Sequence, residues 1–253
     1  MKPTTQWMDD FNEFDSDSWS FDMGDGSQYG IPGWGNNEQQ CYTNSQANYE
    51  ISESSIRMKA LYYQTPFQCD GGSPKQWTSV KMTTKNKKIF KPTGDETVQI
   101  MARIKVPQQH GAWAGFWMLP NPGKNVAAWC DSGEIDIMEH VNTDDEIFTN
   151  IHYRDQHSRQ CTYQGKRFPL LADDWHVYEF QWSRYHLRWI VDGQLINVMP
   201  NDASLPFHSN GFYIILNLAV GGNLVGTHID TSHPMQMEVD WLSVNTLSPS
   251  HKS

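Results

Sequence analysis

Short β-forming segments separated by turn-forming residues constrain the fold of this chain more than any other feature. Several of them alternate apolar and polar residues with a period of two, which is typical of strands with one buried face. Clusters of Pro, Gly, Asn and Asp separate them, and VDGQ at 191–194 is typical of a hairpin turn. The segments read SSIRMKAL, ETVQIMARIKV, GEIDIMEH, IFTNIHY, WHVYEFQW, HLRWIVDG, FYIILNLAV and MQMEVDWLSVN.

The chain of 253 residues reads as one structural unit. It contains no segment with a sustained helical period, no internal repeat, no low-complexity stretch and no linker. All-β sandwiches of this length often form a single domain. The sequence therefore predicts an all-β fold, an antiparallel β-sandwich of the jelly-roll type. We expect one domain over 1–253, with a core from about 9 to 246 and a short polar C-terminal tail.

Charge and aromatic content narrow the class of partner. The formal net charge is −10 and the pI is about 5.4, which disfavours nucleic acid, because affinity for phosphates rests on Lys and Arg. Aromatic residues make up 13% of the chain and include 11 Trp. Packing in the core explains most of them, but aromatic faces also stack on pyranose rings, so a neutral carbohydrate is the favoured partner.

The sequence predicts neither a membrane partner nor a signal peptide. No apolar run approaches the roughly 18 residues of a membrane-spanning helix. The first residues, MKPTTQWMDD, lack the apolar centre of a signal peptide. This pattern fits either the mature form of a secreted, extracellular protein, which we expect, or a cytosolic protein. We also expect a monomer.

The four cysteines, at 41, 69, 130 and 161, have none of the C-x-x-C spacing of zinc or redox sites. An even number permits disulfides, with three pairings open. Buried free thiols are the alternative.

The segment GEIDIMEH at 133–140 places three carboxylates among apolar residues. Glu134 and Asp136 are two residues apart and share one face of a strand, whereas regular alternation sends Glu139 to the opposite face. One extra residue, a β-bulge near Ile137–Met138, would return Glu139 to the face of the other two. The alternative is an ordinary strand with a solvated acidic edge, or with Glu139 turned inward.

A bulge would also set the distance between the outer carboxylates. Five regular strand residues cover roughly 16–17 Å and four cover roughly 13 Å. After two Glu side chains of roughly 4 Å reach toward each other, the shorter span leaves their carboxyls about 5–6 Å apart, as in a double-displacement glycosidase. An inverting glycosidase needs about 6.5–9.5 Å.

The segment SGEIDIMEH resembles the signature of glycoside hydrolase family sixteen in its bulged form. Further blocks resemble the laminarinases of that family in the family's order and span nearly the whole chain. They read GWGNNEQQCYT (33–43), WTSVKMTTKNK (77–87), ARIKVP (102–107), GAWAGFWMLP (111–120), FYIILNLAVGGNLVG (212–226) and MEVDWLSVN (237–245). The resemblance implies a concave substrate cleft and a catalytic domain that cleaves β-1,3-glucan.

The resemblance also implies roles for the three acids. Glu134 corresponds to the nucleophile, Glu139 to the general acid/base and Asp136 to the assisting acid of a retaining endo-β-1,3-glucanase. Neighbouring carboxylates disfavour each other's charged forms, which fits an acid that keeps its proton. No cofactor is expected for catalysis.

Five further residues are candidates for contact with a glycan: Asn36, Trp113, Trp117, Trp129 and His152. Similar enzymes carry a Trp shortly before the nucleophile and a His on the following strand, and Asn36 corresponds to a subsite asparagine of the family. The alternatives are core packing for the tryptophans, a turn at Asn36 and a hydrogen-bonded sheet histidine at His152.

Some features depart from the family pattern. Lys81 stands where laminarinases usually have Arg, and the segment 61–76 is longer than usual, so individual subsites are expected to differ. Three alternative functions stay open: a related hydrolase acting on mixed-linkage glucan, agarose or another galactan, a transglycosylase, and a non-catalytic β-glucan-recognition protein.

The resemblance finally implies a structural calcium ion bound by Glu13 and Asp240, away from the cleft. Backbone carbonyls of the loop 22–26 and water would complete the six to eight oxygen ligands that calcium prefers. The alternative is a solvated Glu13 and an Asp240 that caps a turn.

Overall fold

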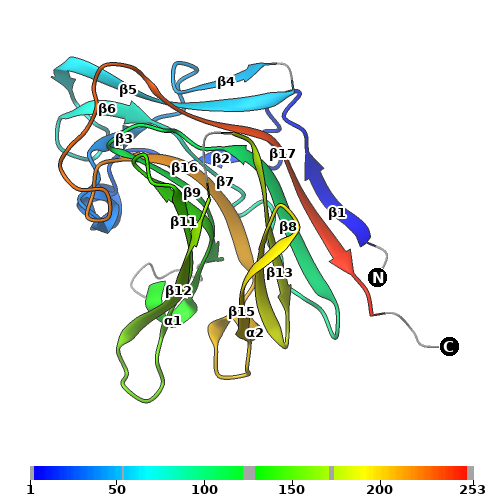
Figure 1. The fold of residues 1–253 in the computed structure, drawn as a ribbon. Helices are drawn as coiled ribbons and strands as arrows, with labels where there is room; N and C mark the ends of the chain where they lie inside the picture. Colours follow the sequence, from blue (N-terminus) through cyan, green and yellow to red (C-terminus); the bar gives the residue numbers. More distant parts are fainter. Residues whose placement is uncertain (1–2, 53, 122–128, 171–173, 250–253) are drawn as a thin grey trace.

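The computed structural model describes residues 3–52, 54–121, 129–170 and 174–249. Two largely antiparallel sheets pack face to face in it (Figure 1). The strands are β1 (Pro3–Asp9), β2 (Ser20–Phe21), β3 (Gln40–Tyr42), β4 (Tyr49–Ser52), β5 (Ser55–Phe67), β6 (Lys75–Ser79), β7 (Lys81–Thr83), β8 (Thr97–Lys105), β9 (Ala112–Pro120), β10 (Glu134–Val141), β11 (Glu146–Arg154), β12 (Cys161–Pro169), β13 (His176–Ser183), β14 (His186–Val191), β15 (Gln194–Pro200), β16 (Phe212–Val220) and β17 (Met235–Leu247).

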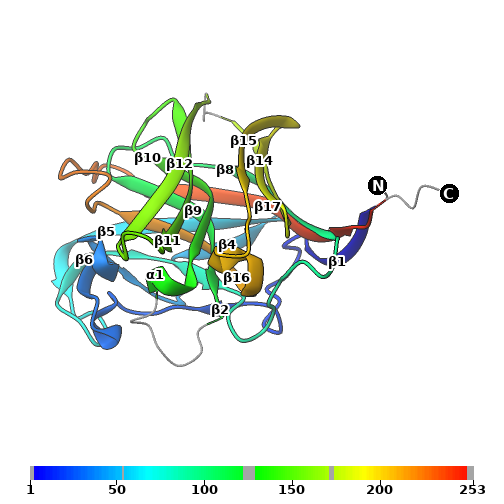
Figure 2. The ribbon, with the colours of Figure 1, turned by 90° about the horizontal axis from the view of Figure 1, so that it is seen from below.

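The order of the strands confirms the predicted β-sandwich. In the ten-stranded sheet it is β15-β14-β13-β8-β17-β5-β6-β3, with β1 beside β17 and β4 beside β5. In the seven-stranded sheet it is β12-β11-β10-β9-β16-β7-β2. Because β1 pairs with β17, the two ends of the described chain lie close together (Figures 1 and 2).

Each of the eight expected segments falls on a strand, and the two α-helices among the described residues are short: α1 (Trp129–Ser132) and α2 (Pro206–Ser209). The edge strand β12 was not expected. Most of its residues are exposed on both faces, so its sequence lacks the alternation that marks a strand. No helix in the described parts of the chain is long and apolar enough to cross a membrane.

The core lies between the two sheets and contains much of the aromatic content. Trp19, Trp182 and Trp189 are fully buried there. Burial of a large apolar side chain contributes about 1.5–3 kcal/mol, so these residues stabilise the sandwich rather than bind a ligand. Core packing therefore accounts for part of the tryptophan content.

All four cysteines form disulfides, in one of the three pairings that the sequence left open. Cys41 pairs with Cys69, which ties β3 to the long hairpin between β5 and β6. Cys130 pairs with Cys161, which ties α1 to the beginning of β12. The second disulfide fixes the position of the chain just before the acidic strand β10.

Candidate active site

A bulge in β10 brings the three acids of the strand to one side. Opposite β11, Asp136 pairs with Asn150 and Glu139 pairs with Phe148, so three steps along β10 match two along β11. Opposite β9, the register shifts between Asp136 and Met138. The predicted bulge near Ile137–Met138 is confirmed, and all three acids line the same cleft.

This cleft, of about 1010 Å³, runs along the outer face of the seven-stranded sheet. Side chains of β7, β9, β10, β11, β12 and β16 line it, together with the loop around Trp34. Its position confirms the concave cleft that the resemblance implied. The predicted residues Asn36, Trp113, Trp117, Trp129 and His152 all lie on its wall.

Glu134 has a hydrogen-bond donor at one carboxylate oxygen and an imidazole near the other. The indole Nε1 of Trp129 donates a hydrogen bond to Oε2 at 2.6 Å, and Nε2 of His152 lies 3.8 Å from Oε1. Burial, and next the charge of Asp136, raise the pKa of Glu134 to about 8, whereas His152 and Trp129 favour its anion. The Glu134 side chain is therefore oriented at the cleft wall, and burial disfavours its charged form.

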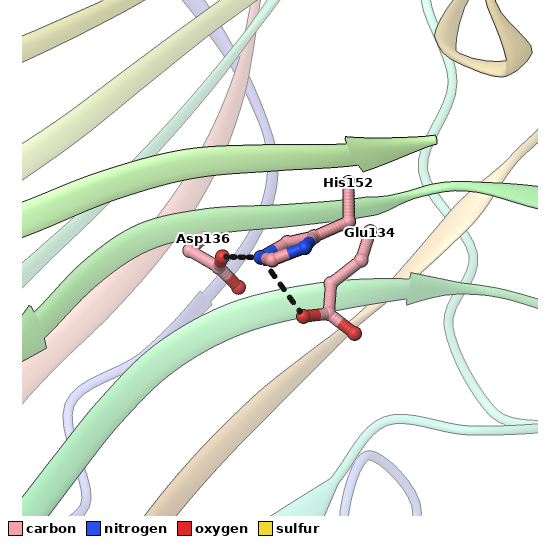
Figure 3. A group of neighbouring side chains, drawn as sticks. All are labelled: Glu134, Asp136 and His152. Atoms are coloured by element: carbon pink, nitrogen blue, oxygen red, sulfur yellow. Dashed lines mark ion pairs between the residues drawn. The ribbon is translucent and has the colours of Figure 1, made fainter. Parts of the chain in front are cut away.

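Asp136 is the most deeply buried of the three acids, with 2% of its surface exposed. Its Oδ2 lies 3.2 Å from Nε2 of His152 (Figure 3). The indole of Trp189 donates to its backbone carbonyl at 2.8 Å and so fixes the strand at the bulge. Burial, followed by the charge of Glu139, raises the pKa of Asp136 well above its usual value, so Asp136 holds a proton in preference to its neighbours.

Glu139 accepts hydrogen bonds at both oxygens. Trp113 Nε1 donates to Oε1 at 2.9 Å, and Asn150 Nδ2 donates to Oε2 at 3.1 Å. Burial raises its pKa, while these two donors act in the opposite direction. Gly165 pairs with Asn150 across β11 and β12. Because Gly165 has no Cβ, the Asn150 amide can occupy the space next to it. Glu139 is thus positioned by donors from both neighbouring strands, β9 and β11.

The other half of the cleft contains an aromatic and amide network. Trp117 Nε1 donates to Asn217 Oδ1 at 2.7 Å, and Asn217 Nδ2 donates to the Tyr42 hydroxyl at 3.0 Å. Lys81 Nζ lies 4.0 Å from the ring centroid of Trp34. These contacts hold flat aromatic faces at the cleft surface, as a row of sugar rings requires.

Lys81 and Asn36 have their polar groups engaged within the protein. Lys81 is buried and pairs with Asp22, with Nζ 3.3 Å from Oδ2. Asn36 Nδ2 donates to Glu38 Oε1 at 3.2 Å, and Glu38 is buried, which raises the pKa of its carboxyl. The charge of Lys81 is therefore already paired with Asp22 inside the protein.

The cleft residues that sequence reasoning missed include Glu38, Asn150, Tyr163 and Asn217. Three of these four carry a signal that was available. Asn150 is two residues before His152 and so shares its strand face, and Glu38 lies inside the quoted block GWGNNEQQCYT. Asn217 also lies inside a quoted block, FYIILNLAVGGNLVG, whereas Tyr163 carries no such signal, because it stands on the unexpected edge strand β12.

The calcium site predicted at Glu13 and Asp240 is not shown by the structure. Asp240 Oδ2 is engaged by Arg103 at 2.6 Å, and Glu13 is exposed beyond the end of β1. Among the described residues, one group of three or more His, Cys, Asp or Glu side chains could hold a metal ion, and it contains neither of them. The structure gives the calcium site no support, and it stays a prediction.

Comparisons with known proteins agree with this geometry. Residues 34–243 match the model of glycosyl hydrolases family 16. The chain is 32% identical to glucan endo-1,3-beta-glucosidase A1 of Niallia circulans, over 94% of this chain and 37% of that protein. It is 30% identical to a beta-glucanase of Rhodothermus marinus, over 94% and 83%. The laminarinase catalytic domain of Thermotoga maritima MSB8 superimposes with a TM-score of 0.84 at 28% identity, over 98% of this chain and all of that one.

Proposed function

Because this chain belongs to glycosyl hydrolases family 16, we propose that it is a retaining, endo-acting hydrolase of β-1,3-glucosidic bonds in laminarin-type glucans. The observation that carries the proposal is the bulged strand β10, which presents Glu134, Asp136 and Glu139 to one open cleft. Each of the two glutamates has an indole donor of its own. This arrangement supports two different roles for two otherwise similar acids.

The proposed reaction is a double displacement. The Glu134 carboxylate attacks the anomeric carbon while Glu139 protonates the departing glycosidic oxygen. Glu139 then removes a proton from water, which attacks the glycosyl-enzyme ester and releases the sugar with retained configuration. Hydrogen bonds from Trp113 and Asn150 keep Glu139 beside the leaving oxygen throughout.

The crowding of the acids limits how many of them are charged. Three buried carboxyls in contact cannot all be ionised at neutral pH. Burial disfavours the charged form of all three acids, and that of Asp136 is strongly disfavoured. The roles of Glu134 and Glu139 in this proposal come from their positions on the bulged strand, where each has its own indole donor.

The shape and lining of the cleft support a polysaccharide substrate. The cleft extends across the sheet from Trp34 at one end to Tyr163 at the other, so a glucan chain can lie along it and be cut internally. Trp129 is 43% exposed and offers a ring face beside the nucleophile. The two disulfides favour an oxidising compartment, so we also infer secretion, and we infer a monomer.

Product analysis on laminarin, curdlan, lichenan and agarose tests the substrate. We expect internal cleavage of laminarin, with the β-anomer appearing first in proton NMR spectra of early products. Preferred cleavage of lichenan or agarose would favour the related-hydrolase alternative, and oligosaccharides longer than the starting material would indicate transglycosylation. An α-anomer formed first would refute the retaining mechanism.

Variants of the two glutamates test the residues. Glu134→Ala should be inactive on all substrates, whereas Glu139→Ala should lose activity on laminarin and keep part of it on an activated aryl glycoside, whose leaving group needs no proton. Asp136→Asn should reduce the rate less than either. Glu50→Gln, at an exposed acid outside the cleft, is the control and should match the parent protein. Laminarin hydrolysis at the parent rate by either alanine variant would contradict the assignment.

A further inference from the structure

Three potential metal-binding atoms converge at the nucleophile end of the acidic strand. Glu134 and His152 are directly opposite each other in the pairing of β10 with β11, and Asp136 is two residues along from Glu134. Glu134, Asp136 and His152 each offer one atom, and these atoms lie within 4.8 Å of one another (Figure 3). The cluster therefore combines an imidazole with two carboxylates.

A second observation points to a missing partner in this cluster. Asp136 Oδ2 is buried, faces His152, and accepts no hydrogen bond of acceptable geometry, although the imidazole nitrogen is 3.2 Å away. Glu134 Oε1 faces the cluster, because Trp129 donates to Oε2 and His152 Nε2 lies 3.8 Å from Oε1. Burial favours a proton on Asp136, and a bound cation would replace that proton and give the buried Oδ2 a partner.

From this geometry we propose that Glu134, Asp136 and His152 form a binding site for a divalent transition-metal cation, Zn²⁺ or Cu²⁺, whose occupancy shuts off the catalytic centre. The inhibitory part of the proposal rests on the proposed hydrolase function. The binding part rests on the three side chains alone.

The distances in the cluster fit a small metal ion. Ligands about 2.0–2.1 Å from a tetrahedral zinc are roughly 3.3–3.4 Å from one another. His152 Nε2 lies 3.2 Å from Asp136 Oδ2 and 3.8 Å from Glu134 Oε1. A small movement of the Glu134 carboxylate therefore closes the site, and the remaining coordination position opens into the cleft, where water can fill it.

The donor set selects the class of metal. Imidazole suits zinc and copper, whereas calcium needs six to eight oxygen ligands and magnesium prefers to keep most of its water. Glu139 stays outside the cluster, since Trp113 and Asn150 occupy its two oxygens. A metal bound to Oε1 of Glu134 would take up the electron pair that the reaction needs, and its water would occupy space meant for the sugar.

Isothermal titration calorimetry of the metal-free protein with Zn²⁺ tests binding. We expect one site in the parent protein and at least a tenfold higher Kd in His152→Ala and in Glu134→Gln. His228→Ala is the matched control. His228 lies outside the cluster and forms a histidine pair with His110, with ring centroids 5.1 Å apart. An unchanged Kd in both cluster variants, or loss of binding in His228→Ala, would overturn the proposal.

Inhibition of laminarin hydrolysis tests the consequence. Zn²⁺ should raise the apparent KM, EDTA should restore the rate, and Mg²⁺ at the same concentration should have no effect. Parent activity that persists when calorimetry shows the site to be saturated would overturn the inhibitory part. If laminarin is not hydrolysed at all, the hydrolase proposal fails while the calorimetric result still decides whether the metal site exists.

Discussion

Replacing Gly165 with Ala should weaken catalysis although Gly165 itself carries no reactive group. A Cβ at this position would lie 1.8 Å from Asn150 Oδ1 and 2.5 Å from the Thr149 carbonyl oxygen, and real Cβ contacts are essentially never under 3.0 Å. The Asn150 amide must therefore move by more than an ångström. Its hydrogen bond to Glu139, now 3.1 Å long, cannot survive that movement.

The size of the effect follows from the lost hydrogen bond. A hydrogen bond to a charged group contributes about 1.5–3 kcal/mol, and each 1.36 kcal/mol corresponds to about tenfold in rate. We therefore expect kcat/KM on laminarin to fall about 10–100-fold. Overpacking at the sheet edge should cost about 1–3 kcal/mol of stability as well. Because the Asn150 donor lowers the pKa of Glu139, its loss should move the alkaline limb of the pH profile upward.

Initial rates across pH on laminarin and on an activated aryl glycoside provide the assay. Asn150→Ala removes the donor without the clash, so it should reproduce the loss of activity and the shift of the alkaline limb with a smaller loss of stability. Gln164→Ala, at the adjacent exposed position of β12, is the control and should match the parent protein. Parent activity in both Gly165→Ala and Asn150→Ala would refute the reasoning.

Three other changes have defined outcomes. The pKa of Glu134 is raised in the folded protein to about 8 from a usual 4.5, so its contribution to stability is present below about pH 4.5 and lost as pH rises through about 8. Glu134→Gln, which stays neutral, should therefore have a higher Tm than the parent at pH 9 and an equal Tm at pH 4, by scanning calorimetry; a lower Tm at pH 9 would contradict this. Trp129→Ala should raise KM and lower kcat/KM on β-1,3-glucan by removing a ring face and the donor to Glu134, whereas a lowered Tm with unchanged kcat/KM would return Trp129 to a packing role. The two disulfides span similar separations, 28 and 31 residues, so replacing either pair with Ser should cost a similar amount of about 2–4 kcal/mol in denaturant titrations. Only the Cys130–Cys161 pair should also lower kcat/KM, because it fixes α1 beside Glu134; equal kinetic losses would argue against that role.

The sequence by itself determined the strands and the bulge, because both are local properties. Period-two alternation depends on residues within one segment, and it identified β8, β10 and β13. The uneven spacing of Glu134, Asp136 and Glu139 made sense only with one extra residue, and the structure has the register shift there. The roles predicted for the three acids came from the family resemblance of the same segment, SGEIDIMEH.

The surroundings of those acids depended on tertiary structure. Asn150 reaches Glu139 because β11 lies beside β10, and Gly165 permits it because β12 lies beside β11. The disulfide partners were open for the same reason, since neither pair is close in sequence. Spacing along the chain carries no information about which strands become neighbours.

The prediction for Asp240 shows the limit most clearly. An acid on the last strand was assigned to calcium by its resemblance to a family block, but the neighbouring strand β8 presents Arg103 to the same carboxylate. β1 pairs with β17, and Glu13 lies past the end of that pairing. Whether two distant acids share an ion depends on which other charges fold between them, and only the packed sandwich decides that.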